Sequence, residues 1–137
     1  MDTEGLKLRT KKYALRIIKL TQSLPANTVG WAINKQLIRS GTSVGANYRA
    51  VCRARSTAEF ISKLGIVIEE ADESAFWLEL IIESGLMKEE LINPLLKETN
   101  ELISIMVSSS KSKSFSSKKI FKDSEILNSA STTLFVE

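Results

Sequence analysis

Histidine is absent from this sequence of 137 residues. Its absence removes the commonest general base and the commonest protein ligand of zinc, copper and iron. A Ser-His-Asp or Cys-His catalytic arrangement is therefore excluded, and so is a di-iron site of the Glu-x-x-His kind found in helical bundles. We expect a protein that is not an enzyme and has no catalytic residue, cofactor or metal site.

Cysteine and long apolar runs are also scarce. Cys52 is the single cysteine, so no intramolecular disulfide is possible, which suits a reducing compartment. No uncharged apolar run approaches the roughly 18–20 residues of a membrane span. The first residues are acidic and polar and lack the basic and apolar segments of a secretion signal. We therefore expect a cytoplasmic protein that does not associate with a membrane.

The net charge of +3 conceals a strong asymmetry along the chain. Residues 1–56 carry eleven Lys and Arg against two acids, whereas residues 57–107 carry three against eleven. Residues 108–137 carry five Lys against three acids. A basic half followed by an acidic half is typical of a protein with a polyanionic partner, or of one that assembles through complementary surfaces.

Apolar residues at helical spacing predict four helices within residues 1–107. The predicted inward residues are Tyr13, Ile17, Leu20 and Leu24; Ile33, Leu37, Ser40, Val44, Tyr48 and Val51; Phe60, Leu64, Val67, Ala71, Leu78 and Ile82; and Leu91, Leu95, Leu102 and Met106. The predicted caps and stops are Pro25, Asn27 or Thr28, Ser56 or Thr57, Gly85, and Asn93-Pro94 as a late cap or a kink. With short connections, these segments predict an all-α, antiparallel up-down four-helix bundle.

Two further features qualify this bundle. Ile66, Trp77 and Leu80 fall on a second side of the third helix, so its apolar surface is wider than one core requires. Gly41 and Gly45 lie within the second helix, where each costs about 1 kcal/mol of helix propensity, and they indicate either close helix packing or a kink.

The helical pattern ends near residue 108. Residues 108–137 are a Ser- and Lys-rich, low-complexity segment that is too polar to bury. We therefore expect a bundle domain over residues 1–107 and a mostly disordered tail over residues 108–137.

Basic residues of the first two helices also recur at helical spacing, away from the apolar stripes. They are Arg9, Lys12, Arg16 and Lys19 on the first helix and Lys35, Arg39, Arg49 and Arg53 on the second. Like charges at such spacings repel by a few tenths of a kcal/mol per pair, so something other than monomer stability favours them. Contact with nucleic-acid phosphates is one interpretation. The alternatives are a solvated face, or a face that pairs with the acidic third helix of the same or a neighbouring subunit.

The third helix is densely acidic. Its carboxylates are Glu69, Glu70, Asp72, Glu73, Glu79 and Glu83. The oxygen-donor loop and glycine turn of a calcium site are missing, and nothing indicates the burial that acid–base catalysis needs. We expect a solvated or salt-bridged face.

The segment 37–50, followed by Glu59-Phe60 and by the acidic run 69–74, resembles the bacterial four-helix-bundle family of proteins encoded in intervening sequences of 23S rRNA. Thr42-Ser43-Val44 with Asn47 and the downstream Glu59-Phe60 carry the most specific part of the resemblance, which covers about residues 5–107. It implies an antiparallel four-helix bundle that assembles as a pentamer. In related accessory proteins of diversity-generating retroelements, a basic surface is associated with nucleic acid and with a reverse transcriptase. The family has no established catalytic residues to carry over.

This chain departs from the family pattern at two places. Residues 48–50 read Tyr-Arg-Ala where many members read Ile-Ala-Glu-Gly, which indicates a different branch, and the Ser-rich tail is not part of the family core.

The leading hypothesis is a homo-oligomeric, non-enzymatic protein that binds RNA or DNA through its backbone phosphates. The eight basic residues of the first two helices would neutralise charge and position the nucleic acid without reading bases. One alternative is an adaptor that docks an acidic partner protein, and another is a structural oligomer that binds no nucleic acid.

Overall fold

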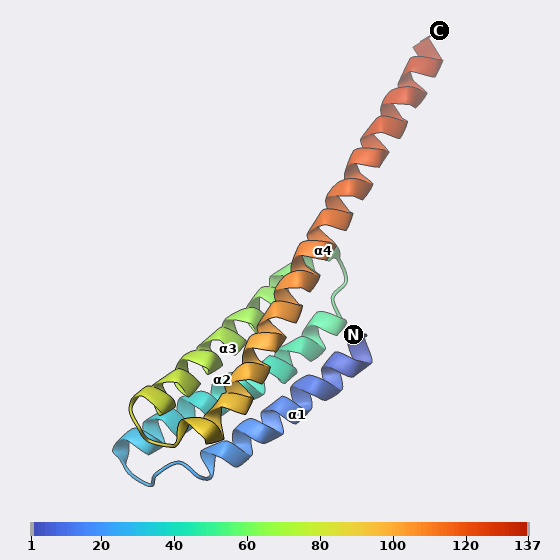
Figure 1. Cartoon of the computed structure of the whole chain (residues 1–137). Coiled ribbons are helices and arrows are strands. Elements are labelled where there is room, and N and C mark those ends of the chain that lie inside the picture. Colours follow the sequence, from blue (N-terminus) through green and yellow to red (C-terminus); the bar gives the residue numbers. More distant parts are fainter. Residues whose placement is uncertain (1, 137) are drawn as a thin grey trace.

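The computed structural model describes the backbone of residues 2–136 and the side chains of residues 2–128. Four helices follow one another: α1 Thr3–Thr21, α2 Thr28–Cys52, α3 Thr57–Glu83 and α4 Glu89–Val136. Consecutive helices run antiparallel through short connections, and α1 to α3 pack with the first part of α4 in an up-down bundle (Figure 1). The predicted fold class is confirmed. Within the described residues, no helix combines the length and apolar character needed to cross a membrane.

Capping side chains set where the helices begin. Asn27 Oδ1 accepts a hydrogen bond from the Gly30 amide at 2.8 Å, and Ser56 Oγ accepts one from the Glu59 amide at 3.1 Å. Each bond satisfies an amide that has no partner within its own helix. Gly85, with φ +73°, follows the end of α3, where glycine adopts this conformation without a Cβ penalty. The structure thus selects Asn27 and Ser56 from the predicted pairs of caps.

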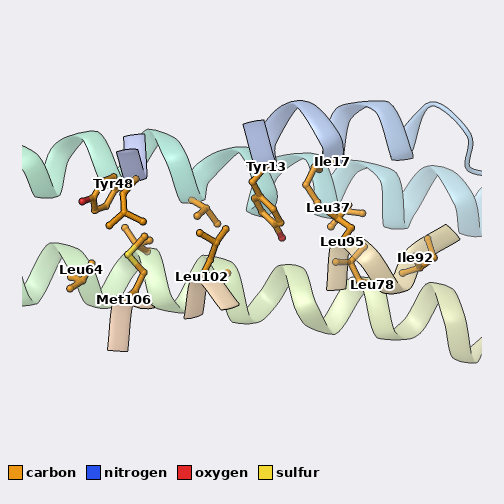
Figure 2. Packing of buried hydrophobic residues seen from close by; sticks show 14 of the residues in the cluster. Tyr13, Ile17, Leu37, Tyr48, Leu64, Leu78, Ile92, Leu95, Leu102 and Met106 are labelled. Carbon is orange, nitrogen blue, oxygen red and sulfur yellow. The ribbon is translucent and has the colours of Figure 1, made fainter. Parts of the chain in front are cut away.

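A continuous apolar core runs along the bundle between all four helices (Figure 2). Its largest fully buried side chains are Tyr13, Ile17, Leu37, Val44, Val51, Leu64, Val67, Leu78, Ile81, Ile92, Leu102 and Met106. The predicted stripes are confirmed except near the ends of two helices. At the end of α3, Ile81 is buried and the predicted Ile82 is only partly buried against the core. At the start of α4, Leu91 is 59% exposed and Ile92 is buried in its place, because Ile92 continues the steps of three and four that lead to Leu95, Thr99, Leu102 and Met106. α4 begins at Glu89, so Pro94 lies inside the helix and not at its cap. Ile92, Leu95 and Met106 then share the inward face.

A buried polar layer crosses the core, with one residue from each helix. The hydroxyls of Tyr13 and Thr99 are hydrogen-bonded at 2.6 Å, and Ser74 Oγ donates to Ser40 Oγ at 2.9 Å. Burial raises the pKa of Tyr13 to about 12. Buried polar groups must find partners, so this layer favours one alignment of the four helices.

Glycines bring α1 and α2 close together. A Cβ added at Gly41 would lie 2.7 Å from Cγ1 of Ile17, and one at Gly45 would lie 3.2 Å from the carbonyl oxygen of Thr10. Since α2 is unbroken from Thr28 to Cys52, these glycines permit close helix packing.

The segment after residue 107 is helical, where the sequence predicts a mostly disordered tail. α4 continues to Val136 as one helix that projects beyond the end of the bundle (Figure 1). No proline or glycine interrupts residues 108–136, so the helix propagates from turns that are already formed. The side chains of residues 115–128 are all exposed, which agrees with the prediction that this segment buries no core.

Candidate nucleic-acid interface

The eight predicted basic residues do not share one surface. Six of them lie along three different seams between helices, and two of these six are held by carboxylates of the same chain. The surroundings of each group therefore decide which side chains are available to an external phosphate.

Arg9 joins α1 to α4. Its Nε and Nη2 donate to the two carboxylate oxygens of Glu98 at 2.9 and 2.5 Å, and Nη2 also lies 2.8 Å from Oε2 of Glu101. The side chains of Arg9 and Glu98 are only 23% and 17% exposed. The hydrogen bonds from Arg9 are the main cause that lowers the pKa of Glu98. Arg9 is thus engaged by two carboxylates and serves as a link between helices.

Arg39 joins α2 to α3. Its guanidinium lies 3.1 Å from Oε2 of Glu70 and also donates to the carboxylate of Glu73. The hydrogen bond to Glu73 is the main cause that raises the pKa of Arg39. For this residue, the structure matches the alternative in which the basic face pairs with the acidic third helix of the same subunit.

Arg49 and Arg53, at the C-terminal end of α2, line a groove between α2 and α1. This α1–α2 groove has a volume of about 420 Å³ and is bordered by four cations, Lys7, Lys11, Arg49 and Arg53. Lys7 has a weak, exposed partner in Glu4, 3.1 Å away. Among the described side chains, no carboxylate lies within ion-pair distance of the other three cations.

Small side chains create the space in this groove. Its lining between the cations consists of Ala14 on α1 and Thr42, Gly45 and Ala46 on α2. Because the residues along the seam are short, the helix backbones approach closely and the long cationic side chains stand at the edges. A phosphate entering the groove would meet positive charge from both helices and no bulky side chain.

The other predicted residues lie elsewhere. Arg16 and Lys19 line a second hollow of about 390 Å³ between α1 and the start of α4, beside Met87 and Leu91. Lys12 and Lys35 are exposed and border neither hollow.

Lys7 and Lys11 were not among the predicted site residues. The sequence does carry a local signal for them, since Lys7, Lys11 and Ala14 recur at steps of four and three. The residues from Arg9 to Lys19 on the same helix have a similar spacing, so the sequence does not show which of the two sets borders a groove. The position of α2 beside Lys7 and Lys11 shows it.

The acidic helix offers no metal site in the part of the chain with described side chains, where no group of three or more Cys, Asp or Glu is arranged to hold an ion. Cys52 is a half-buried free thiol.

Comparison with known proteins identifies the family. Residues 7–108 match the sequence profile described as 23S rRNA-intervening sequence protein. The chain belongs to this family. No curated protein matches the chain.

A crystal structure of a relative agrees with this assignment. It is a protein of unknown function from the S23 ribosomal protein family of Bacteroides thetaiotaomicron, 34% identical in sequence, and it superimposes with a TM-score of 0.75. The superposition covers 81% of this chain and 99% of the relative. All the groove residues fall within the region shared with the 23S rRNA-intervening sequence proteins, whereas the end of α4 lies beyond it.

Proposed function

We propose that this member of the 23S rRNA-intervening sequence family binds RNA or DNA, without catalysing a reaction, through phosphates held in the α1–α2 groove. The observation that carries the proposal is the gathering of Lys7, Lys11, Arg49 and Arg53 around one hollow, three of them without a carboxylate partner among the described side chains. Lysine and arginine side chains that bind phosphates release the counterions condensed on a nucleic acid. Side chains without a carboxylate partner do this without first breaking an ion pair.

The lining of the groove indicates what part of the nucleic acid it would contact. No aromatic side chain borders it, so bases have no stacking surface there. The cations lie on both sides of a row of small residues between two antiparallel helices. This arrangement can contact successive phosphates of a nucleic-acid backbone and offers few groups that would read a base edge. We therefore expect affinity with little dependence on base sequence.

The predicted stripes contribute unequally in this proposal. Arg49 and Arg53 supply the α2 side of the groove, and Lys12, Arg16, Lys19 and Lys35 add positive potential around it. Arg9 and Arg39 contribute little, because Glu98, Glu101, Glu70 and Glu73 already neutralise them.

Self-association is a second part of the proposal. The outer surfaces of α1 and α2 expose Leu8, Leu15 and Trp31, with exposed fractions of 53%, 58% and 63%. A group of large exposed apolar side chains is typical of a surface that meets another protein. Several copies in a closed assembly, such as the pentamer implied by the family resemblance, would present several grooves to one nucleic acid and raise its overall affinity.

The test is a titration of labelled RNA and DNA, each as duplex and single strand, at several salt concentrations. We expect the binding constant to fall log-linearly with salt, and the slope to decrease by about 2 in the variant Arg49→Glu/Arg53→Glu, since each phosphate contact contributes about 0.9 to the slope on B-DNA.

A variant with the same charge change outside the groove controls for net charge. Lys88→Glu/Lys97→Glu alters two exposed lysines of the α3–α4 connection and α4, and we expect it to keep most of the wild-type salt slope. Equal losses in the two variants would show that net charge alone attracts the nucleic acid. Absence of binding at low salt would contradict the proposal and favour an acidic protein partner.

A further inference from the structure

The part of α4 beyond the bundle carries a basic face with apolar residues among the lysines. We call residues 111–126 the basic arm. The side chains of this face recur at steps of one, three or four residues: Lys111, Phe115, Lys118, Lys119, Lys122 and Ile126. All of them are exposed, Phe115 by 71% and Ile126 by 58%. No ion pair within the described residues involves any of these lysines.

A complementary face lies on α3. We define the acidic face by its exposed members, which recur at the same spacing: Ile66, Glu69, Asp72, Phe76, Glu79 and Glu83. Ile66 is 43% and Phe76 is 51% exposed. The carboxylates of α3 that pair with Arg39 are Glu70 and Glu73, so the four acids of the acidic face take no part in ion pairs within the described residues.

Each face is electrostatically unfavourable by itself. Lys118 and Lys122, and likewise Glu79 and Glu83, are like charges four residues apart on a helix, a spacing that destabilises the helix. A surface of opposite charge would relieve both repulsions. The arm does not supply that surface to its own α3. Its first residues lie beside the start of α3, where Lys111, Phe115 and Lys118 border a hollow with Ile61, and the rest of the arm runs away from the end of the bundle (Figure 1).

We propose that the basic arm docks on the acidic face of α3 in a second copy of this chain. The apolar residues of the two faces lie at comparable distances along their helices. Phe115 and Ile126 are eleven residues apart, about 16 Å along a helix, and Ile66 and Phe76 are ten residues apart, about 15 Å. Lysines lie between the first pair and carboxylates between the second, so apolar and charged contacts form together.

A second copy fits the arm better than a nucleic acid or an anionic membrane does. Phe115 and Ile126 need apolar counterparts, which a phosphate backbone lacks and which the acidic face supplies. An anionic membrane offers apolar contacts and negative charge, but it has no fixed array of carboxylates, whereas the acidic face holds Glu69, Asp72, Glu79 and Glu83 at fixed helical positions. This contact uses neither the α1–α2 groove nor the apolar surface of α1 and α2. It is therefore a separate interface from the one proposed for self-association through α1 and α2, and substitutions in the arm leave that interface unaltered.

Sedimentation equilibrium of the full chain with charge-reversed variants tests the proposal. We expect Lys118→Glu/Lys122→Glu and Asp72→Lys/Glu79→Lys each to weaken self-association by about tenfold or more at low salt, because each reverses two contacts of the same interface. The variant that combines all four substitutions restores opposite charges across the contact, and we expect it to associate more tightly than either parent variant.

Matched controls carry the same charge changes elsewhere. Lys88→Glu/Lys97→Glu and Glu89→Lys/Glu90→Lys alter exposed residues outside both faces, and we expect wild-type association from each. Circular dichroism shows whether every variant keeps its helical fold. Unchanged association in either test variant, or no recovery in the combined one, would overturn the proposal. If Lys118→Glu/Lys122→Glu weakened only binding to RNA or to vesicles of anionic lipid, the arm would serve that partner instead.

Discussion

Four arginines of this bundle fall into two kinds, two that link helices and two that border the α1–α2 groove. Arg9 and Arg39 are each held by two carboxylates of a neighbouring helix. Arg49 and Arg53 stand beside alanine and glycine, with no carboxylate in reach among the described side chains. The same residue type at the same helical spacing thus stabilises the fold at two seams and is left available at the third.

The three seams differ in how they are held together. Ion pairs cross the α1–α4 and α2–α3 seams, whereas the α1–α2 seam depends on the close approach that Gly41 and Gly45 permit. Close packing without charge pairing leaves the cations of this seam free for an external partner. Perturbing each seam in turn therefore separates stability from binding.

The largest effect is expected at the α1–α2 seam, where the helices pack closely and no ion pair crosses between described side chains. Gly41→Ala places a methyl group 2.7 Å from Cγ1 of Ile17, and the overpacking should lower the free energy of unfolding by about 1–3 kcal/mol. Gly65→Ala is the matched control, because a Cβ there meets nothing within 4 Å, and it should raise stability by roughly 0.5–1 kcal/mol through helix propensity. Urea unfolding followed by circular dichroism measures both. Equal shifts of the same sign would show that the α1–α2 contact is not close-packed.

A smaller loss is expected at the α1–α4 seam. Arg9→Met removes the partner of the part-buried Glu98 and should cost about 1 kcal/mol at neutral pH, after allowance for solvent screening. Nucleic-acid binding should change less than it does in the groove variant Arg49→Glu/Arg53→Glu.

The pH dependence of stability sharpens this prediction. Arg9 lowers the pKa of Glu98 in the folded protein below its ordinary value of 4.5, so the stabilisation is complete above that value and is lost as the pH falls through the folded-state pKa. The difference in stability between the wild type and Arg9→Met should therefore shrink on acidification from pH 7 towards pH 3. Urea midpoints across this range measure it, and a constant difference would contradict the role assigned to Glu98.

Local patterns in the sequence predict most of the bundle. The sequence narrows two caps to pairs of residues that include Asn27 and Ser56, and the core stripes follow from helical spacing, because both depend on residues within a few turns of each other. Leu91 shows where such reasoning fails. A shift of one residue, from Leu91 to Ile92, changes the buried face. Both residues are apolar and lie four or three positions before Leu95, so spacing alone does not choose between them, and packing against the other helices decides.

The candidate site depends on information that spacing does not contain. Arg9 and Lys12 belong to one predicted stripe, yet Arg9 turns to Glu98 on α4 and Lys12 stays exposed. Lys11 and Arg49 are far apart in the sequence and meet only because α1 packs against α2. A basic stripe on a single helix shows that charge is present, and the neighbouring helices decide which part of it remains free.

The smallest effect is expected at the α2–α3 seam. Arg39 is 48% exposed, so its pairs with Glu70 and Glu73 are screened by solvent, and Arg39→Gln should destabilise the protein less than Arg9→Met does. Salt should shrink the difference between Arg39→Gln and the wild type, because exposed charges are screened over about 10 Å at 0.1 M ionic strength. Urea midpoints at low and high salt measure the change. A loss of stability in Arg39→Gln that is as large as in Arg9→Met and insensitive to salt would contradict this prediction. It would show that the ion pairs of the α1–α4 and α2–α3 seams stabilise the protein equally. The expected outcome would leave Arg9 as the main ionic link between helices of the bundle.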